Sequence, residues 1–288
     1  MSKGGRAFFV VFSILGLLAL IMSAVYRFCI YGIDKKEGQA ISSDDIVITI
    51  KSVSFVMKPV EGGTFQMGSE NNDGIADDDE KPTHSVTVSS FYISEIEVTQ
   101  GLWEAVMGTT VIYQRNLVNS SSPLRGLGAD LPMYYVNWYE CQEFIRRLNS
   151  QTGKCFRLPT EAEWEYASKG GNKRNDFKYA GSNSLANVAW YSDNSNSSSH
   201  PVKSKTPNAI GLFDMSGNVW EWCQDWYGYY NNNIETNPIG PADGSKRVVR
   251  GGSWYSNSSY CRVTKRYKID PGYRDTCYGF RLVLDSSK

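Results

Sequence analysis

The second half of the chain, from Gly171 to Lys288, has almost no helical periodicity and is dense in glycine, asparagine, serine and tryptophan. Long irregular segments inside a compact domain usually carry binding sites or are held in place by bound ions. No repeat of fixed period divides the 288 residues, and 18 tyrosines and 8 tryptophans can support a core between many turns. We therefore expect one large, loop-rich domain.

Regular secondary structure is expected mainly in the first half. Alternation of apolar and polar residues over 46–56 and a strand-like run at 64–67 predict a hairpin, and alternation resumes over 84–93. The acidic segment 70–82 (ENNDGIADDDEKP) lacks the glycine and glutamate spacing of an EF-hand. We expect it to be a solvated hairpin loop.

Three helices are predicted by local signals. The first spans 100–107 after a capping Thr99, the second covers 138–148 with Gly153 as its stop, and the third starts at Thr160, where Glu163 completes a capping box. Together with the short strands, these helices indicate an α+β fold with little regular secondary structure.

The N-terminus has the pattern of a membrane segment. Lys3 and Arg6 precede the uncharged run 7–26, which as a helix is about 30 Å long, enough to cross a bilayer. Positive flanking charge favours a cytoplasmic N-terminus, so the rest would face the periplasm or the exterior. The alternative is a signal peptide cleaved after Ala24, which would release a secreted protein. The expected organisation is a cytoplasmic end 1–6, a transmembrane or signal segment 7–26, a linker 27–45 and a domain 46–288.

Charge and motifs exclude several functions. Thirty basic residues balance thirty acidic ones, so nothing predicts a nucleic-acid partner. His84 and His200 are the only histidines and form no zinc motif, and the phosphate-loop, dinucleotide and nucleophile-elbow motifs are absent. Six cysteines permit disulfides in an exported chain, but their spacing matches no metal motif.

Five segments in order resemble the formylglycine-generating-enzyme (sulfatase-modifying factor) superfamily. They are EGGTFQMGS at 61–69, FRLPTEAEWEYA at 156–167, NAIGLFDMSGNVWEW at 208–222, RGGSW at 250–254 and GFR at 279–281. The resemblance covers residues 56–284 and implies a single atypical α+β domain, related to C-type lectins and stabilised by calcium.

The resemblance also implies metal sites. The side chains of Asp214 and Glu221 and the carbonyl groups of Gly217 and Val219 would hold one calcium ion, and hard oxygen ligands suit this ion. A second family site would begin at Asn187 and Val188, but the acidic partner that should follow is not recognisable in the sequence.

The sequence departs from the family's oxidases at the catalytic cysteine pair. These enzymes bind copper(I) through two thiolates shortly after the GGS turn. Counting from that turn places the first cysteine on Ser256 and the second on Cys261, whereas counting back from GFR leaves Cys261 outside the pair. Either register leaves at most one thiolate, and serine oxygen does not replace sulfur for copper(I), so copper is not expected. Cys223 is expected to form a disulfide with Cys261, or both remain buried thiols.

The predicted function is binding without catalysis. An extracytoplasmic protein, peptide or glycan would dock on the calcium-stabilised scaffold, and the candidate surface comprises residues 226–230 and Trp254 with Tyr255. The ancestral catalytic cleft would include Ser253, Arg250, Trp254 and Arg266. The alternative is a divergent formylglycine-generating oxidase or another metal-dependent oxidoreductase.

Overall fold

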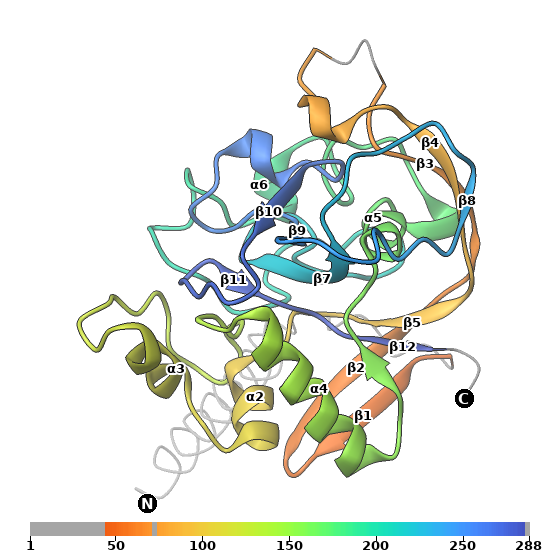
Figure 1. Cartoon of the computed structure of the whole chain (residues 1–288). Helices are drawn as coiled ribbons and strands as arrows, with labels where there is room; N and C mark the ends of the chain where they lie inside the picture. The colour runs from red at the N-terminus through yellow and green to blue at the C-terminus, as the bar shows by residue number, and fades with distance from the viewer. Residues whose placement is uncertain (1–43, 71–73, 286–288) are drawn as a thin grey trace, which may run out of the picture. The chain divides into compact units, whose positions relative to one another are not determined.

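The computed structural model describes residues 44–70 and 74–285, which belong to one compact unit. Three β-sheets and a small number of helices are joined by long loops (Figure 1). Among these described residues, every helix is too short or too polar to span a lipid bilayer. The predicted segments 1–6 and 7–26 and the linker up to residue 43 lie outside the described residues.

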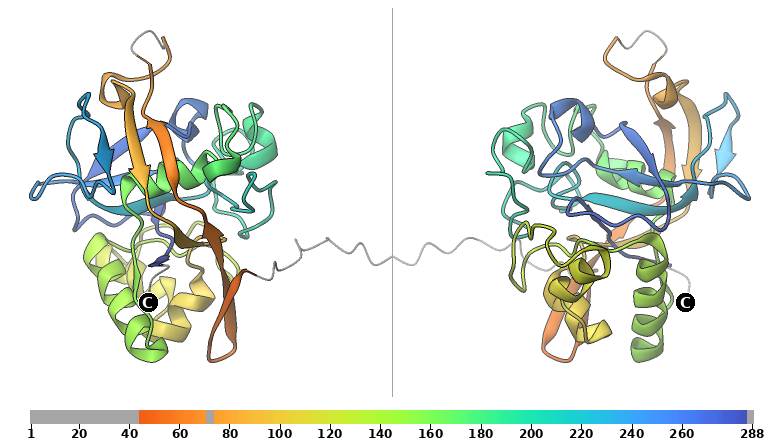
Figure 2. Two further views of the ribbon diagram at one scale, coloured as in Figure 1. Left: turned by 90° about the vertical axis from the view of Figure 1, so that its right-hand side faces the viewer. Right: turned by 60° about the vertical axis from the view of Figure 1, so that its left-hand side comes forward.

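The largest sheet is antiparallel, with strand order β1-β2-β5-β12-β6. Its strands are β1 (Ile46–Ile50), β2 (Val53–Val60), β5 (Phe91–Ser94), β6 (Phe156–Arg157) and β12 (Val283–Asp285). Helices α2 (Gln100–Met107) and α4 (Trp138–Thr152) pack against each other and against this sheet (Figure 2). Trp103, Phe144 and Phe280 form the aromatic centre of the resulting core. This half of the domain is a conventional hydrophobic layer.

The first hairpin differs from the predicted one. β1 pairs with β2 across a tight turn, with Ile50 opposite Val53 and Lys51 in the left-handed region at φ 53°. The pairing predicted between 46–56 and 64–67 is wrong, because the chain leaves the sheet at Gly62. A Cβ at Gly62 would lie 2.6 Å from the Val88 carbonyl oxygen, so only glycine fits this crossing.

Two smaller sheets make up the other half. The four-stranded sheet has the order β10-β9-β7-β11 and the three-stranded sheet the order β3-β4-β8. Their strands are β7 (Trp220–Trp226), β9 (Arg247–Arg250), β10 (Arg266–Ile269), β11 (Tyr278–Gly279), β3 (Gly63–Met67), β4 (His84–Val88) and β8 (Glu235–Thr236). Helix α5 (Glu161–Ser168) contacts both sheets and is completely buried.

The three predicted helices are confirmed with their caps. Thr99 accepts the Leu102 N–H at the start of α2, and Thr160 and Glu163 form the predicted capping box of α5. Gly153 ends α4 in the left-handed conformation, as predicted, and the last helical residue, Thr152, lies four residues beyond the predicted helix end. The remaining helices are α3 (Val111–Val118) and α6 (Leu185–Val188), with 3-10 turns η1 (Asp78–Glu80), η2 (Gly171–Lys173) and η3 (Ser258–Cys261). α3 was not predicted because it buries only Val111 and Gln114.

The acidic segment does connect a hairpin, since β3 pairs with β4. It is not simply solvated, however. Glu80 is 0% exposed, and Arg262 donates to both of its carboxylate oxygens at 2.6 Å. Lys265 also pairs with Asp77. The expectation of a solvated loop is therefore wrong for Glu80, because two basic residues 182 or more positions away fix the loop to the domain.

Candidate functional site

The segment 211–222 begins with a tight coil in which four residues have a positive φ, the first being Gly211 at 81°. Asp214, Gly217 and Asn218 all have positive φ, at 58°, 82° and 58°. A Cβ at Gly217 would lie 2.3 Å from the Trp190 carbonyl oxygen, so this position requires glycine. The coil ends in β7, which carries Glu221 into the centre of the domain.

Three buried carboxyl groups meet beside this coil. Glu221 accepts from Arg281 at 2.6 and 2.7 Å and from the Trp164 indole at 2.7 Å. Glu97 accepts from the Asn218 side chain at 2.7 Å and from the Val219 N–H at 3.1 Å.

Asp214 is the third carboxyl group. Its Oδ2 accepts the Lys203 N–H at 2.8 Å, whereas its Oδ1 is buried without a hydrogen-bond partner. Glu97 was missed by sequence reasoning because it lies 121 residues from Asn218 and in no recognised motif.

The cluster has more negative than positive charge. Burial, followed by the charges of Asp214 and Glu221, raises the pKa of Glu97 well above its ordinary value. Burial likewise raises the pKa of Asp214 to about 6. Arg281 is shared by all three groups but forms an ion pair only with Glu221. A further cation would stabilise the charged forms of Glu97 and Asp214.

The predicted calcium ligands fit this geometry only in part. Asp214 has a free buried oxygen of the kind that Ca²⁺ prefers. Glu221 does not fit, because Arg281 and Trp164 already occupy its oxygens. Calcium at Asp214, Gly217, Val219 and Glu221 stays a prediction.

The second predicted calcium site has the carbonyl group of Asn187 occupied by a protein donor. The Asn187 carbonyl oxygen accepts the Thr206 N–H at 3.0 Å, and Lys205 donates its ammonium group to the Ala186 carbonyl at 2.9 Å. Val188 is buried in a small core. A lysine cation thus lies beside the segment where the family would bind a metal, which does not favour an additional ion there.

Asp214 predicts a specific pH dependence of stability. Its pKa is about 6 in the folded protein against an ordinary value of 3.8, so the folded state binds more protons between these pH values and stability falls as the pH rises through them. As the pH rises from 4 to 7, the free energy of unfolding of Asp214→Asn should therefore increase by up to about 3 kcal/mol relative to that of the wild type. Urea unfolding at several pH values measures this. Parallel pH profiles for the wild type and the variant would contradict it, and exposed Asp176→Asn serves as the control.

The thiol region surrounds Ser253. The Ser253 N–H donates to the Ser256 hydroxyl at 3.0 Å, and the two hydroxyl oxygens are 3.1 Å apart. Cys261 is 0% exposed; burial raises its pKa to about 12, a rise that a hydrogen bond from the Ser253 backbone opposes. Cys277 contacts the Ser253 hydroxyl and the Thr276 hydroxyl, and burial raises its pKa to about 11.

The five cysteines of the described residues are all free. The disulfide considered for Cys223 and Cys261 is therefore not formed, and the alternative, buried thiols, is confirmed: the two residues belong to different core clusters. Cys277 was not expected here. Its position beside Ser253 depends on the parallel pairing of β11 with β7, which no local sequence signal predicts.

Two of the predicted cleft residues are core residues. Arg250 is 0% exposed and pairs with Glu165, and Trp254 is 3% exposed and donates its indole N–H to the Thr276 carbonyl at 3.1 Å. Ser253 is also buried. Burial of Arg250, Ser253 and Trp254 does not favour a cleft at these positions, and their role in a cleft stays a prediction. Arg266 does line a cavity, described below.

A group of exposed tyrosines lies next to the thiol region. We call Tyr255, Tyr260, Tyr267 and Tyr273, which are 72%, 37%, 41% and 43% exposed, the tyrosine surface. Buried Trp220 contacts the rings of Tyr260 and Tyr267 from below, at 6.2 and 5.6 Å between ring centroids.

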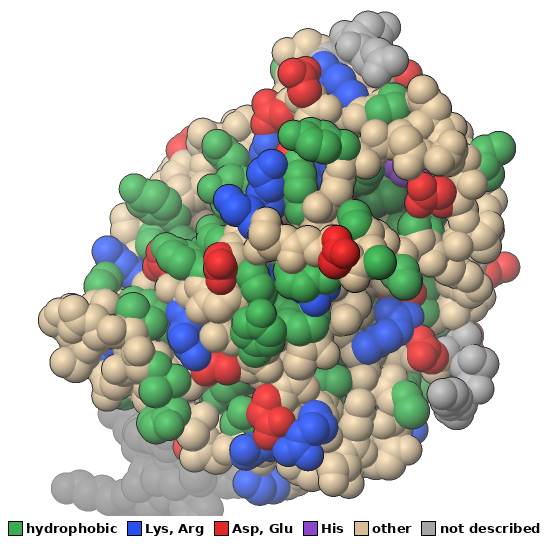
Figure 3. All heavy atoms as spheres, in the orientation of Figure 1, with side chains coloured by type: hydrophobic (Ala, Val, Ile, Leu, Met, Phe, Trp, Pro, Cys, Tyr) green, Lys and Arg blue, Asp and Glu red, His purple; other side chains and the backbone are tan. Residues whose placement is uncertain are grey.

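Green side chains gather over the sheet that contains β7, β10 and β11 in Figure 3. Tyr255 of the predicted surface is thus exposed, whereas Trp254 is not. In the other predicted part, 226–230, Tyr229 is exposed at 78%.

The coil at 211–222, the GGS turn and the buried Arg281–Glu221 pair define a loop-rich α+β domain of the formylglycine-generating-enzyme type. A model of the sulfatase-modifying factor enzyme 1-like domain matches residues 54–286, and the chain belongs to this family. The resemblance inferred from the five sequence segments is thereby confirmed.

Two proteins similar in sequence to this chain have different names and different lengths. The chain is 29% identical over 282 residues to the formylglycine-generating enzyme of Streptomyces coelicolor, covering 78% of this chain and 88% of that enzyme. It is 33% identical over 242 residues to the serine/threonine-protein kinase pkn1 of Chlamydia caviae, covering 78% of this chain but 37% of the kinase. The second similarity therefore concerns one part of a longer protein.

Among solved structures, the Treponema denticola variable protein 1 is similar over its whole length. The superposition has a TM-score of 0.74 at 36% sequence identity and covers 85% of this chain and 100% of that one. The chain is thus similar to proteins named as a formylglycine-generating enzyme, as a serine/threonine-protein kinase and as a variable protein.

Proposed function

We propose that this domain does not generate formylglycine and instead binds a partner. The observation that carries the proposal is the pair Ser256 and Cys261. A serine hydroxyl occupies the place that the resemblance gives to the first catalytic thiol, and it is hydrogen-bonded to Ser253. The remaining thiol, Cys261, is fully buried, and burial raises its pKa to about 12, so the segment offers copper(I) at most one sulfur ligand beside a hydroxyl instead of two thiolates.

The second candidate function is a divergent oxidase, and one observation favours it. Cys261 contacts the backbone of Ser253, and Cys277 contacts its side chain. Together with the similarity to a formylglycine-generating enzyme, this makes Cys277 the candidate, among the thiols that the structure describes, to replace the missing ligand. Its raised pKa, about 11, argues against a thiolate here as well.

The other alternative, a metal-dependent oxidoreductase with histidine ligands, has weaker support. His84 packs against the Tyr230 ring, while His200 stacks on Trp190 and contacts the Ser195 carbonyl oxygen at 2.7 Å. Each histidine therefore has its own structural partners, and the two belong to separate sets of contacts. This arrangement supports structural roles for both.

The tyrosine surface is the binding face that we propose. Tyrosine rings give a large contact area at low entropic cost and stack on sugars as well as on peptide groups. These four side chains stand on a scaffold fixed by buried Arg–Glu pairs, so little ordering would be needed on binding. The partner would be a protein, peptide or glycan outside the cytoplasm, and calcium would add rigidity to the scaffold.

Alanine variants test the binding face. Purified protein is applied to glycan and peptide arrays, and the strongest binder is titrated against Tyr260→Ala and Tyr267→Ala. Each variant should bind about 30-fold more weakly, as for a hot-spot tyrosine. Tyr113→Ala, which removes an exposed tyrosine from α3, is the control and should bind normally. Equal loss in all three variants, or no loss in any, would refute the assignment.

A further inference from the structure

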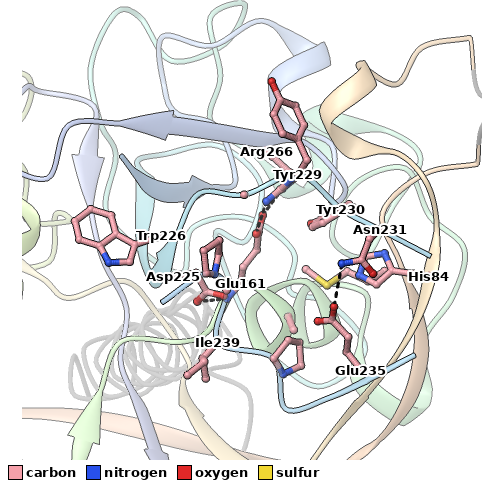
Figure 4. A pocket seen from close by; sticks show the side chains of 16 residues that line it. His84, Glu161, Asp225, Trp226, Tyr229, Tyr230, Asn231, Glu235, Ile239 and Arg266 are labelled. Carbon is pink, nitrogen blue, oxygen red and sulfur yellow. Dashed lines mark hydrogen bonds and ion pairs between the residues drawn. The ribbon is translucent and has the colours of Figure 1, made fainter. Parts of the chain in front are cut away.

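A cavity of about 340 Å³ lies apart from the thiol region and is enclosed by β4, the start of α5, the end of β7, the loop 228–241 and β10 (Figure 4). Its polar lining residues include His84, Glu161, Asp225, Tyr230, Glu235 and Arg266. Their side chains come from segments up to 182 residues apart in the sequence, so no sequence motif marks this site.

One charged pair in the cavity is already satisfied. Arg266 donates to both carboxylate oxygens of Glu161, at 2.6 and 2.7 Å, and its remaining nitrogen donates to the Asp79 carbonyl at 2.9 Å. The Tyr230 ring lies 3.8 Å from the Arg266 guanidinium carbon. This pair forms a rigid wall and leaves no free charge of its own.

Asp225 differs from Glu161 in having no cation in ion-pair contact, because Arg247 and Arg266 act on it only as nearby charges. It is 4% exposed, and its Oδ2 accepts the Glu161 N–H at 2.9 Å. Within residues 44–70 and 74–285, no basic side chain forms an ion pair with it. Burial, and then the charges of Glu161 and Glu163 against the opposing charge of Arg266, raise its pKa well above the ordinary range. A buried carboxyl group of this kind is stabilised by a cation.

Other lining groups add to the preference for a cation. Glu235 contributes another carboxylate, bonded only to the exposed Asn231 amide at 3.4 Å. The Tyr230 hydroxyl is buried without a hydrogen-bond partner. With Glu161 and Arg266 neutralising each other, the lining carries excess negative charge and one unused hydroxyl group.

The loop 228–241 provides the apolar part of the site. Pro238, Ile239 and Pro241 line the cavity, and Ile239 is 68% exposed at its mouth. Gly240 has φ 72°, and a Cβ there would lie 2.9 Å from the Asp225 Cβ. The loop therefore passes directly against Asp225, and only glycine fits at position 240.

We propose that this cavity binds a terminal ammonium or guanidinium group at the end of an aliphatic chain. The cation would pair with Asp225 and donate to the Tyr230 hydroxyl oxygen, while the aliphatic chain would contact Ile239 and the two prolines. A free aliphatic amine and a lysine or arginine side chain of a protein share this chemistry. The proposal is independent of the binding role of the tyrosine surface.

Isothermal titration at neutral pH tests the proposal on the full chain. The probes are n-pentylamine, N-acetyl-lysine methylamide and N-acetyl-arginine methylamide, with N-acetyl-norleucine methylamide as the uncharged match. At least one cationic probe should bind, at least about 10-fold more tightly than the norleucine probe. Binding of pentylamine as well as the capped amino acids would indicate a small amine; binding of the capped amino acids alone would indicate a protein side chain.

Two variants locate the binding. Asp225→Asn keeps an oxygen to accept the Glu161 N–H and should weaken binding about 10–100-fold. Tyr230→Phe removes a hydroxyl that has no partner, so it should weaken binding without unfolding the protein. Asp243→Asn removes an exposed negative charge beyond the cavity and should leave binding unchanged. Failure of every cationic probe to bind, equal binding of the norleucine probe, or unchanged affinity in folded Asp225→Asn would overturn the proposal.

Discussion

Replacing Arg281 by methionine is expected to destabilise the domain by about 3–5 kcal/mol, because breaking a buried ion pair leaves an uncompensated charge. Arg281 is 0% exposed and makes two hydrogen bonds to Glu221. It also donates to the carbonyl groups of Ser94 and Phe213. Its loss would remove the cation that acts on Glu97, Asp214 and Glu221 together, and the charge of Lys205 would remain near Asp214. Urea unfolding of the purified protein measures the effect.

Two further variants show whether the ion pair is responsible. Glu221→Gln combined with Arg281→Met should cost less than the sum of the two single changes, because the residues act as a pair. Arg146→Met removes an arginine from an exposed ion pair on α4 and should have no measurable effect. An Arg281→Met protein as stable as the wild type would show that the buried pair does not support the coil at 211–222.

Ser256→Cys is expected to create a copper(I) site. The substitution would restore the thiol that the resemblance places at this position, beside Cys261 in the sequence register of the oxidases. Two sulfur ligands suit copper(I), whereas sulfur with a hydroxyl does not. The affinity of the protein for copper(I) should rise on the order of 100-fold or more. The wild type should bind no stoichiometric copper, and the variant should bind one copper ion per chain. Competition with a copper(I) chelator under anaerobic conditions gives this affinity.

The matched controls separate a defined site from added thiol content. Ser258→Cys places a thiol at an exposed position of the same segment and should not gain tight binding. Ser256→Cys combined with Cys261→Ser should lose the gain. Equal copper affinity in Ser256→Cys and Ser258→Cys would mean that residues 256 and 261 do not form a pair, and that the register counted from GFR is the correct one.

Local signals in the sequence were sufficient for most helices. Thr99, Gly153 and the Thr160–Glu163 box act on neighbouring backbone groups, so their effect can be predicted from a few residues. Strand pairing was harder. The run at 64–67 has the alternation of a strand. It pairs with β4 because the chain leaves the largest sheet at Gly62, where only glycine fits against the Val88 carbonyl.

The candidate site was predictable only where it coincided with a recognised motif. Asp214 and Glu221 lie in one segment, but Glu97 joins them from 121 residues before Asn218. The sequence did not show that Glu221 is committed to Arg281, since both residues were seen as parts of separate motifs. Trp254 and Tyr255 are adjacent, yet one is buried and the other exposed, because the chain turns between them. Exposure of this kind depends on tertiary packing.

The most direct measurement is formylglycine formation by the wild-type protein. It is incubated with copper(I), O₂ and a peptide containing the C-x-P-x-R sequence, next to the formylglycine-generating enzyme of Streptomyces coelicolor as positive control, and the peptide is analysed by mass spectrometry. We predict that the peptide cysteine stays unmodified and that no stoichiometric copper is bound. Conversion of that cysteine to formylglycine, with one copper ion per chain, would contradict the account and assign the second ligand to Cys277.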